Sequence, residues 1–130
     1  MLSVDTNVLV RFLVKDHPSQ SERAGELIHH NRIWIAKTVL LETEWILRST
    51  YAYSPDRVLA AFRGLTGLPQ VEVEGELEVA EAMRWFAAGM DFADALHLAS
   101  SEGAEEFATF DRKFAAKAAK LTSTKVLTLH

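Results

Sequence analysis

Four short motifs along the chain place carboxylate side chains inside or beside apolar runs. They read Asp5-Thr6-Asn7, Leu41-Glu42-Thr43-Glu44, Asp91-Phe92-Ala93-Asp94 and Thr109-Phe110-Asp111. An uncompensated negative charge is costly in such surroundings. Several carboxylates brought together would also repel one another unless a proton or a cation lay between them. Because hard divalent cations prefer oxygen ligands, the pattern predicts a Mg²⁺ or Mn²⁺ site.

The two glutamates of the second motif differ in their helical neighbours. Glu44 has Arg48 four residues later, a spacing typical of a solvated ion pair. Glu42 has Val39 and Trp45 one turn away on either side and no basic partner at that distance, so we expect it on an apolar face. The sequence therefore predicts Glu42 as the functional acid and Glu44 as a structural one.

The aspartates of these motifs each have a simpler interpretation as helix residues. Asp is a favoured N-cap, and Asp5, Asp91 and Asp111 each stand where a helix is expected to begin. Asp94 precedes Ala-Leu-His-Leu-Ala and enters a face that should be buried, so we favour it as the deeper metal ligand. Asp91 would act as cap, second ligand or water holder. His97 has a chelating spacing from Asp94, although a core or rim position is its commoner role.

Alternating strands and helices are expected to position these acids. The predicted strands are residues 2–5, 33–36, 70–73, 107–110 and 125–129. The predicted helices are residues 6–14, 19–30, 38–51, one that begins near Pro55, 77–88, 91–101 and 112–119. Such alternation favours a parallel sheet with helices on both faces, and ligands bind beyond the carboxyl ends of its strands. Asp5 and Asp111 each fall at such an end. In helix 77–88 we expect Leu77, Ala80, Met83 and Ala87 to face inward.

Composition sets outer limits on the protein. The chain has 130 residues, 48% of them hydrophobic, which fits one domain with a sizeable core. It has no cysteine, so thiolate metal sites are excluded, and a reducing cytoplasm suits it. No apolar run approaches a membrane span of about 20 residues, and the first residues lack the regions of a signal peptide. The net charge of −4 argues only weakly against a nucleic acid partner.

The motifs also resemble a known family when they are taken in order. Asp-Thr-Asn follows an apolar strand, Glu42 lies in a helix, and Asp-Phe-Ala-Asp-Ala-Leu-His-Leu-Ala and Thr-Phe-Asp-Arg-Lys-Phe follow. Between Asp5 and Phe114 the chain resembles PIN domains, and most closely the VapC-type toxins of bacterial and archaeal toxin–antitoxin pairs. The resemblance implies one PIN-like domain over residues 1–130. Its fold would be a three-layer α/β/α sandwich around a mostly parallel sheet.

The same resemblance implies Mg²⁺- or Mn²⁺-dependent cleavage of RNA (tRNA, rRNA or mRNA), a cognate antitoxin and a homodimer. The implied catalytic acids are Asp5, Glu42, Asp94 and Asp111. The implied metal ligands are Asp5, Asp94 and Asp111. The supporting positions are Thr6, Asn7, Asp91 and Thr109. Candidates to contact the RNA backbone are Arg11, Arg48, Arg112 and Lys113. The last two have the best claim because they directly follow Asp111.

Three alternatives stay open at this point. The chain could process RNA outside a toxin–antitoxin pair. It could be a non-enzymatic interaction module whose acids only cap helices. It could also transfer phosphate with Asp5 as nucleophile, although one such class of phosphatases needs a second Asp two residues later, and that position is Asn7.

Overall fold

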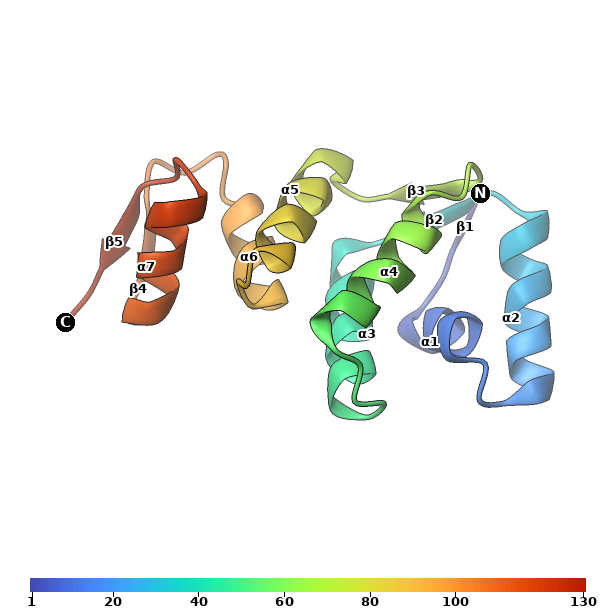
Figure 1. Ribbon diagram of the computed structural model, residues 1–130. Coiled ribbons are helices and arrows are strands. Elements are labelled where there is room, and N and C mark those ends of the chain that lie inside the picture. The colour runs from blue at the N-terminus through green and yellow to red at the C-terminus, as the bar shows by residue number, and fades with distance from the viewer. The chain divides into compact units, whose positions relative to one another are not determined.

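The computed structural model describes all of residues 1–130 and contains seven helices and five short strands (Figure 1). The chain forms two units by its internal contacts, unit 1 (Met1–Glu76) and unit 2 (Leu77–His130). All strands pair in parallel, which confirms the expected α/β class. The hydrogen-bonded strands are divided between two sheets, one in each unit.

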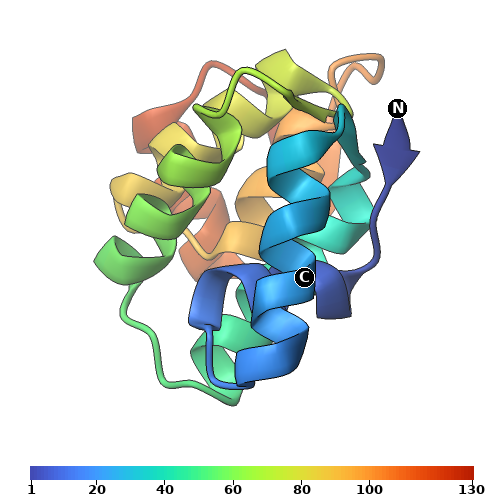
Figure 2. The ribbon, with the colours of Figure 1, turned by 90° about the vertical axis from the view of Figure 1, so that its right-hand side faces the viewer.

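Unit 1 contains a three-stranded sheet and four helices. The strands are β1 (Leu2–Ser3), β2 (Ile33–Ile35) and β3 (Val71–Val73), paired in the order β1-β2-β3. The helices are α1 (Thr6–Val14), α2 (Pro18–His30), α3 (Lys37–Ser49) and α4 (Pro55–Thr66). Figure 2 views this unit with α2 in front. Its core consists of apolar side chains with no solvent exposure, among them Leu9, Ile28, Ile33, Leu40, Leu47 and Phe62.

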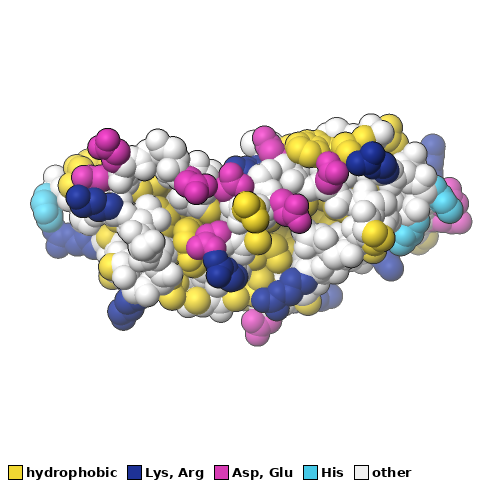
Figure 3. Space-filling model, turned by 90° about the horizontal axis from the view of Figure 1, so that it is seen from above, with side chains coloured by type: hydrophobic (Ala, Val, Ile, Leu, Met, Phe, Trp, Pro, Cys, Tyr) yellow, Lys and Arg dark blue, Asp and Glu magenta, His cyan; other side chains and the backbone are white.

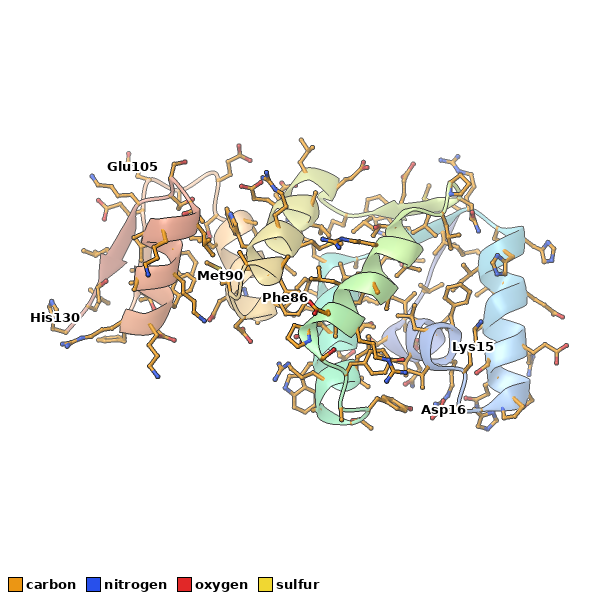
Figure 4. All side chains as sticks on the ribbon, in the orientation of Figure 1. Lys15, Asp16, Phe86, Met90, Glu105 and His130 are labelled. Atoms are coloured by element: carbon orange, nitrogen blue, oxygen red, sulfur yellow. The ribbon has the colours of Figure 1, made fainter.

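Helix ends in unit 1 follow local capping chemistry. At the start of α4, Pro55 occupies the first turn, and the Ser54 hydroxyl accepts the Arg57 backbone N–H at 3.2 Å. Helix α1 ends at Lys15, whose φ of 60° is left-handed, a common way to end a helix. Lys15 and Asp16 form the turn that leads into α2 (Figure 4).

Unit 2 contains α5 (Glu76–Ala87, whose first residue is the last of unit 1), α6 (Phe92–Ala99), β4 (Phe107–Thr109), α7 (Arg112–Leu121) and β5 (Val126–Thr128). Helices α5 and α6 meet through Phe86 and Phe92, whose ring centroids lie 5.4 Å apart at 80°. Met90 is buried in the turn between these helices (Figure 4). Strand β4 contacts α7 through Phe107 and Phe114, with centroids 5.4 Å apart.

The inward face predicted for the helix at residues 77–88 was wrong except at Met83, which is buried. Leu77 is 83% exposed, and Ala80 and Ala87 are exposed as well. The buried side chains of α5 are Val79, Ala82, Met83, Trp85 and Phe86. The sequence offers two apolar stripes on this helix, and the one with the larger side chains is buried, because it removes more apolar surface from water. No helix in the structure is both long and apolar enough to cross a membrane.

Candidate functional site

Asp5 begins α1 in unit 1 as its N-cap. It follows β1 and the buried Val4, and its Oδ1 accepts the Val8 backbone N–H at 3.1 Å. The side chain is exposed. A carboxylate that caps through one oxygen keeps its second oxygen as an acceptor. The simpler interpretation of Asp5 as a cap is therefore confirmed, and it leaves room for a ligand.

Glu42 is joined to the residue that follows Asp5. The Thr6 hydroxyl donates to Glu42 Oε1 at 2.5 Å, across 36 positions in the sequence, and links α1 to α3. Thr6 is buried at 7% exposure, so the side chain that fixes this glutamate is itself held by packing. Glu42 is exposed, which contradicts the prediction that it lies on an apolar face. The reason is that α3 buries the opposite side, Leu40, Thr43, Glu44 and Leu47.

Glu44 forms the predicted ion pair with Arg48 but is not solvated. The Arg48 Nε lies 2.9 Å from Glu44 Oε2, and the glutamate side chain is 2% exposed against 45% for the arginine. A charge buried to this extent is tolerated only with a hydrogen-bonded partner. Glu44 is thus structural, as predicted, whereas the predicted solvation of the pair was wrong.

The acids of unit 2 are held by backbone amides at two helix starts. Asp91 caps α6, and its Oδ2 accepts the Asp94 backbone N–H at 3.1 Å. Asp111 caps α7, and its Oδ1 accepts the Phe114 backbone N–H at 3.0 Å. Thr109 orients this cap, because its hydroxyl accepts the Asp111 backbone N–H at 2.9 Å.

Asp94, a proposed metal ligand, has a raised pKa. Burial raises the pKa of Asp94, and the negative charges of Asp91 and Asp111 raise it further. The charges of His97 and Lys117 act in the opposite direction without cancelling the effect. Within unit 2 the charges of Asp91 and Asp111 therefore act against ionisation of Asp94, in addition to its burial.

Lys117 is a residue near these acids that sequence reasoning missed. It lies on α7, and its Nζ donates to the Gly89 carbonyl oxygen at 2.8 Å. Gly89 has a φ of 109°, a backbone conformation that glycine adopts readily, and stands two residues before Asp91. The bond ties the helix that Asp111 caps to the turn that Asp91 ends. No local sequence signal joins positions 28 residues apart.

The predicted RNA-contacting residues have different surroundings. Arg11 is occupied by Asp16, at 3.0 Å between Nη1 and Oδ1, and by Gln20, which makes it part of the fold. Arg112 lies at the start of α7 with Nη2 3.4 Å from His130 Nδ1, and Lys113 beside it is exposed. The face in Figure 3 carries Lys and Arg among Asp and Glu side chains, so the acidic net charge is not a uniform barrier to phosphate.

The donor set suits a hard cation in its chemistry. No group of three or more Asp, Glu or His side chains in the structure is arranged to hold a metal ion. The candidates are nevertheless all oxygen donors, as Mg²⁺ and Mn²⁺ prefer. Burial raises the pKa of Asp94, the charges of Asp91 and Asp111 raise it further, and a bound cation would lower it. Asp5 and Glu42 belong to unit 1, and Asp94 and Asp111 belong to unit 2.

Comparison with known proteins gives a family. No curated protein matches the sequence. The profile of the PIN domain matches residues 2–120, which include all four candidate acids and most of both units. The chain therefore belongs to the PIN domain family, whose members are typically metal-dependent nucleases.

Proposed function

We propose that this protein is a Mg²⁺- or Mn²⁺-dependent endoribonuclease and the toxin of a toxin–antitoxin pair. The observation that carries the nuclease proposal is the half-buried Asp94, whose pKa is raised by burial and then by the negative charges of Asp91 and Asp111. Helix capping accounts for Asp91 and Asp111, whereas the half-buried Asp94 caps no helix. Membership of a nuclease family supports the same conclusion.

The residues have separable roles in this proposal. In unit 2, Asp94 and Asp111 are proposed as cation ligands, with Asp91 in support. In unit 1, Asp5 is proposed as a ligand because its motif resembles that of the family. When bound, a divalent cation supplies a Lewis acid for the phosphodiester and lowers the pKa of water. Thr6 directs Glu42 by donating to Oε1, so that Oε2 can accept a proton from the attacking water. The water oxygen bonds to phosphorus and the P–O3′ bond breaks. The leaving O3′ takes a proton from solvent, which gives a 3′-hydroxyl and a 5′-phosphate.

The test is RNA cleavage by the wild type with Mg²⁺ or Mn²⁺ and with EDTA, beside Asp5→Asn and Asp94→Asn. We expect EDTA to abolish cleavage and each variant to lower it at least about 100-fold, since loss of residues around a metal site already costs 10–100-fold. Asp56→Asn is a matched control, because Asp56 is exposed and also lies in the first turn of a helix. Cleavage that persists in EDTA or in both variants would overturn the proposal.

The toxin assignment has its own test. It rests on the resemblance of the motifs to VapC-type toxins, which also implies a cognate antitoxin and a homodimer. A small neighbouring gene whose product binds this protein and inhibits cleavage would support it. A nuclease with no such gene would instead process RNA outside a toxin–antitoxin pair.

A further inference from the structure

Two aromatic side chains remain largely exposed. Trp45 on α3 is 58% exposed, and Phe110, between β4 and α7, is 72% exposed. By contrast, Trp85 and Phe92 are 7% and 0% exposed. A single exposed apolar residue needs no explanation. Trp45 and Phe110 differ from an ordinary exposed apolar residue because each lies beside a proposed catalytic acid and a basic residue.

Trp45 lies between a proposed catalytic acid and an arginine in unit 1. Glu42 comes one helical turn before it and Arg48 one turn after it, so the three share one side of α3. Thr6 fixes Glu42 at 2.5 Å, and Glu44 fixes Arg48 at 2.9 Å. The indole therefore stands on a rigid helix between two side chains whose positions are set by hydrogen bonds.

Phe110 has the same kinds of neighbour in unit 2. Asp111 follows it directly, and Arg112 comes next. The bond from the Asp111 backbone N–H to the Thr109 hydroxyl holds the turn on both sides of Phe110. Phe107 and Phe114, the nearest aromatic residues in sequence, pack on each other. The core of this unit therefore takes the rings before and after Phe110 and leaves Phe110 outside.

We propose that Trp45 and Phe110 are platforms on which bases of single-stranded RNA stack, an inference that rests on the proposed function. Unstacked bases bind the faces of aromatic side chains, and cations beside them neutralise the phosphates. Each of these aromatic residues has a basic residue within three positions, which matches that arrangement. Stacking tolerates any base, so the substrate is single-stranded RNA without a strict sequence at these two positions.

The experiment measures binding and turnover separately. Trp45→Leu and Phe110→Leu keep apolar bulk and remove the ring, and Leu77→Ala is the control, because Leu77 is 83% exposed and lies in neither motif. Binding of a labelled 12-nucleotide RNA is measured on Asp94→Asn, which should cleave it at least about 100-fold more slowly, with and without each change. We expect each Leu variant to weaken binding roughly 5- to 150-fold, the usual range for one stacked base. In the active protein KM should rise with kcat nearly constant, because stacking is the same in ground and transition states.

The outcomes are distinguishable. Unchanged binding and KM in both Leu variants, in a protein that cleaves RNA, would overturn the stacking proposal alone. A wild type that neither binds nor cleaves RNA would overturn both proposals. Equal affinity for the single strand and for the same strand in a duplex would overturn the stacking proposal too. So would variants that change only the oligomeric state by light scattering, since the two rings would then pack against a second copy of the chain.

Discussion

The two units stabilise the negative charges of their acidic side chains with different kinds of partner. In unit 1 the partners are side chains: a threonine hydroxyl for Glu42 and an arginine for the buried Glu44. In unit 2 the partners of Asp91 and Asp111 are backbone amides, and the pKa of Asp94 is raised by burial and by the charges of these two acids. An arginine neutralises a carboxylate, whereas capping amides stabilise it by hydrogen bonds and leave its charge in place. The electrostatic free energy of unneutralised acids therefore lowers the stability of unit 2, and a cation should stabilise unit 2 more than unit 1.

The largest effect should come from breaking the ion pair of unit 1. Arg48→Met leaves Glu44 buried without its partner, and we expect unfolding free energy to fall by about 2–3 kcal/mol. The figure is below the ~3–5 kcal/mol of a fully buried pair, because Arg48 is partly solvated. Urea denaturation measures it. Replacing both partners, with Glu44→Leu added, should recover most of the loss, and a double variant less stable than Arg48→Met would contradict this account.

A smaller loss should follow Thr6→Val, which removes the hydroxyl that Glu42 accepts from. One hydrogen bond of this kind contributes about 1 kcal/mol, so we expect a loss of that size and a fall in cleavage rate. Thr6→Ser, which keeps the hydroxyl, should retain most of the rate. The matched change in unit 2 is Thr109→Val, where the partner of the hydroxyl is a backbone amide. If Thr6→Val left the rate unchanged, Glu42 would not depend on that bond.

The smallest effect should have the opposite sign. Asp94→Asn removes a repelled charge from unit 2, and without divalent cation the Tm should rise by about 1–3 °C at neutral pH, a gain kept small by solvent screening. The folded protein holds the Asp94 proton more tightly than the unfolded chain, so the charge lowers stability above the raised pKa. The penalty fades as the pH falls through that pKa, and both proteins should converge below the ordinary value of 3.8.

Millimolar Mg²⁺ should reverse this order, because cation binding to the folded state stabilises the wild type and not Asp94→Asn. Thermal scans with and without Mg²⁺ at several pH values check both statements. A lower Tm for Asp94→Asn without cation at neutral pH would show that the acids of unit 2 are not mutually repelled.

The sequence predicted the elements well because their signals are local. Asp5, Asp91 and Asp111 stand at helix starts as expected, and the strands occur where short apolar runs were found. Helical spacing also gave the pairing of Glu44 with Arg48. Helical spacing could not show which side of α3 is buried, because apolar residues occur on both sides of that helix. Glu42 was therefore expected to be buried and is exposed, whereas Glu44 was expected to be solvated and is buried.

Other features depend on contacts that no local pattern encodes. The bond from Thr6 to Glu42 joins helices 36 residues apart, and the bond from Lys117 to Gly89 joins positions 28 apart. Arg11 was expected to contact RNA, yet Asp16 and Gln20 hold it within the fold. Each of these contacts depends on where a side chain reaches after the chain has folded. The sequence around a basic residue does not show whether that residue binds a ligand at the surface or pairs within the fold.

The pairing of Arg48 with Glu44 has a consequence for genetic experiments. A cell keeps less of a protein whose unfolded fraction grows, so a change of 1–2 kcal/mol can alter abundance several-fold. Arg48 lies beside the proposed stacking surface and also holds a buried charge in place. A screen for variants that lose activity in cells would therefore recover Arg48 substitutions through reduced amount of protein. Dividing activity by protein level would separate the Arg48 substitutions from changes at Trp45, which is exposed and does not pair with a buried charge.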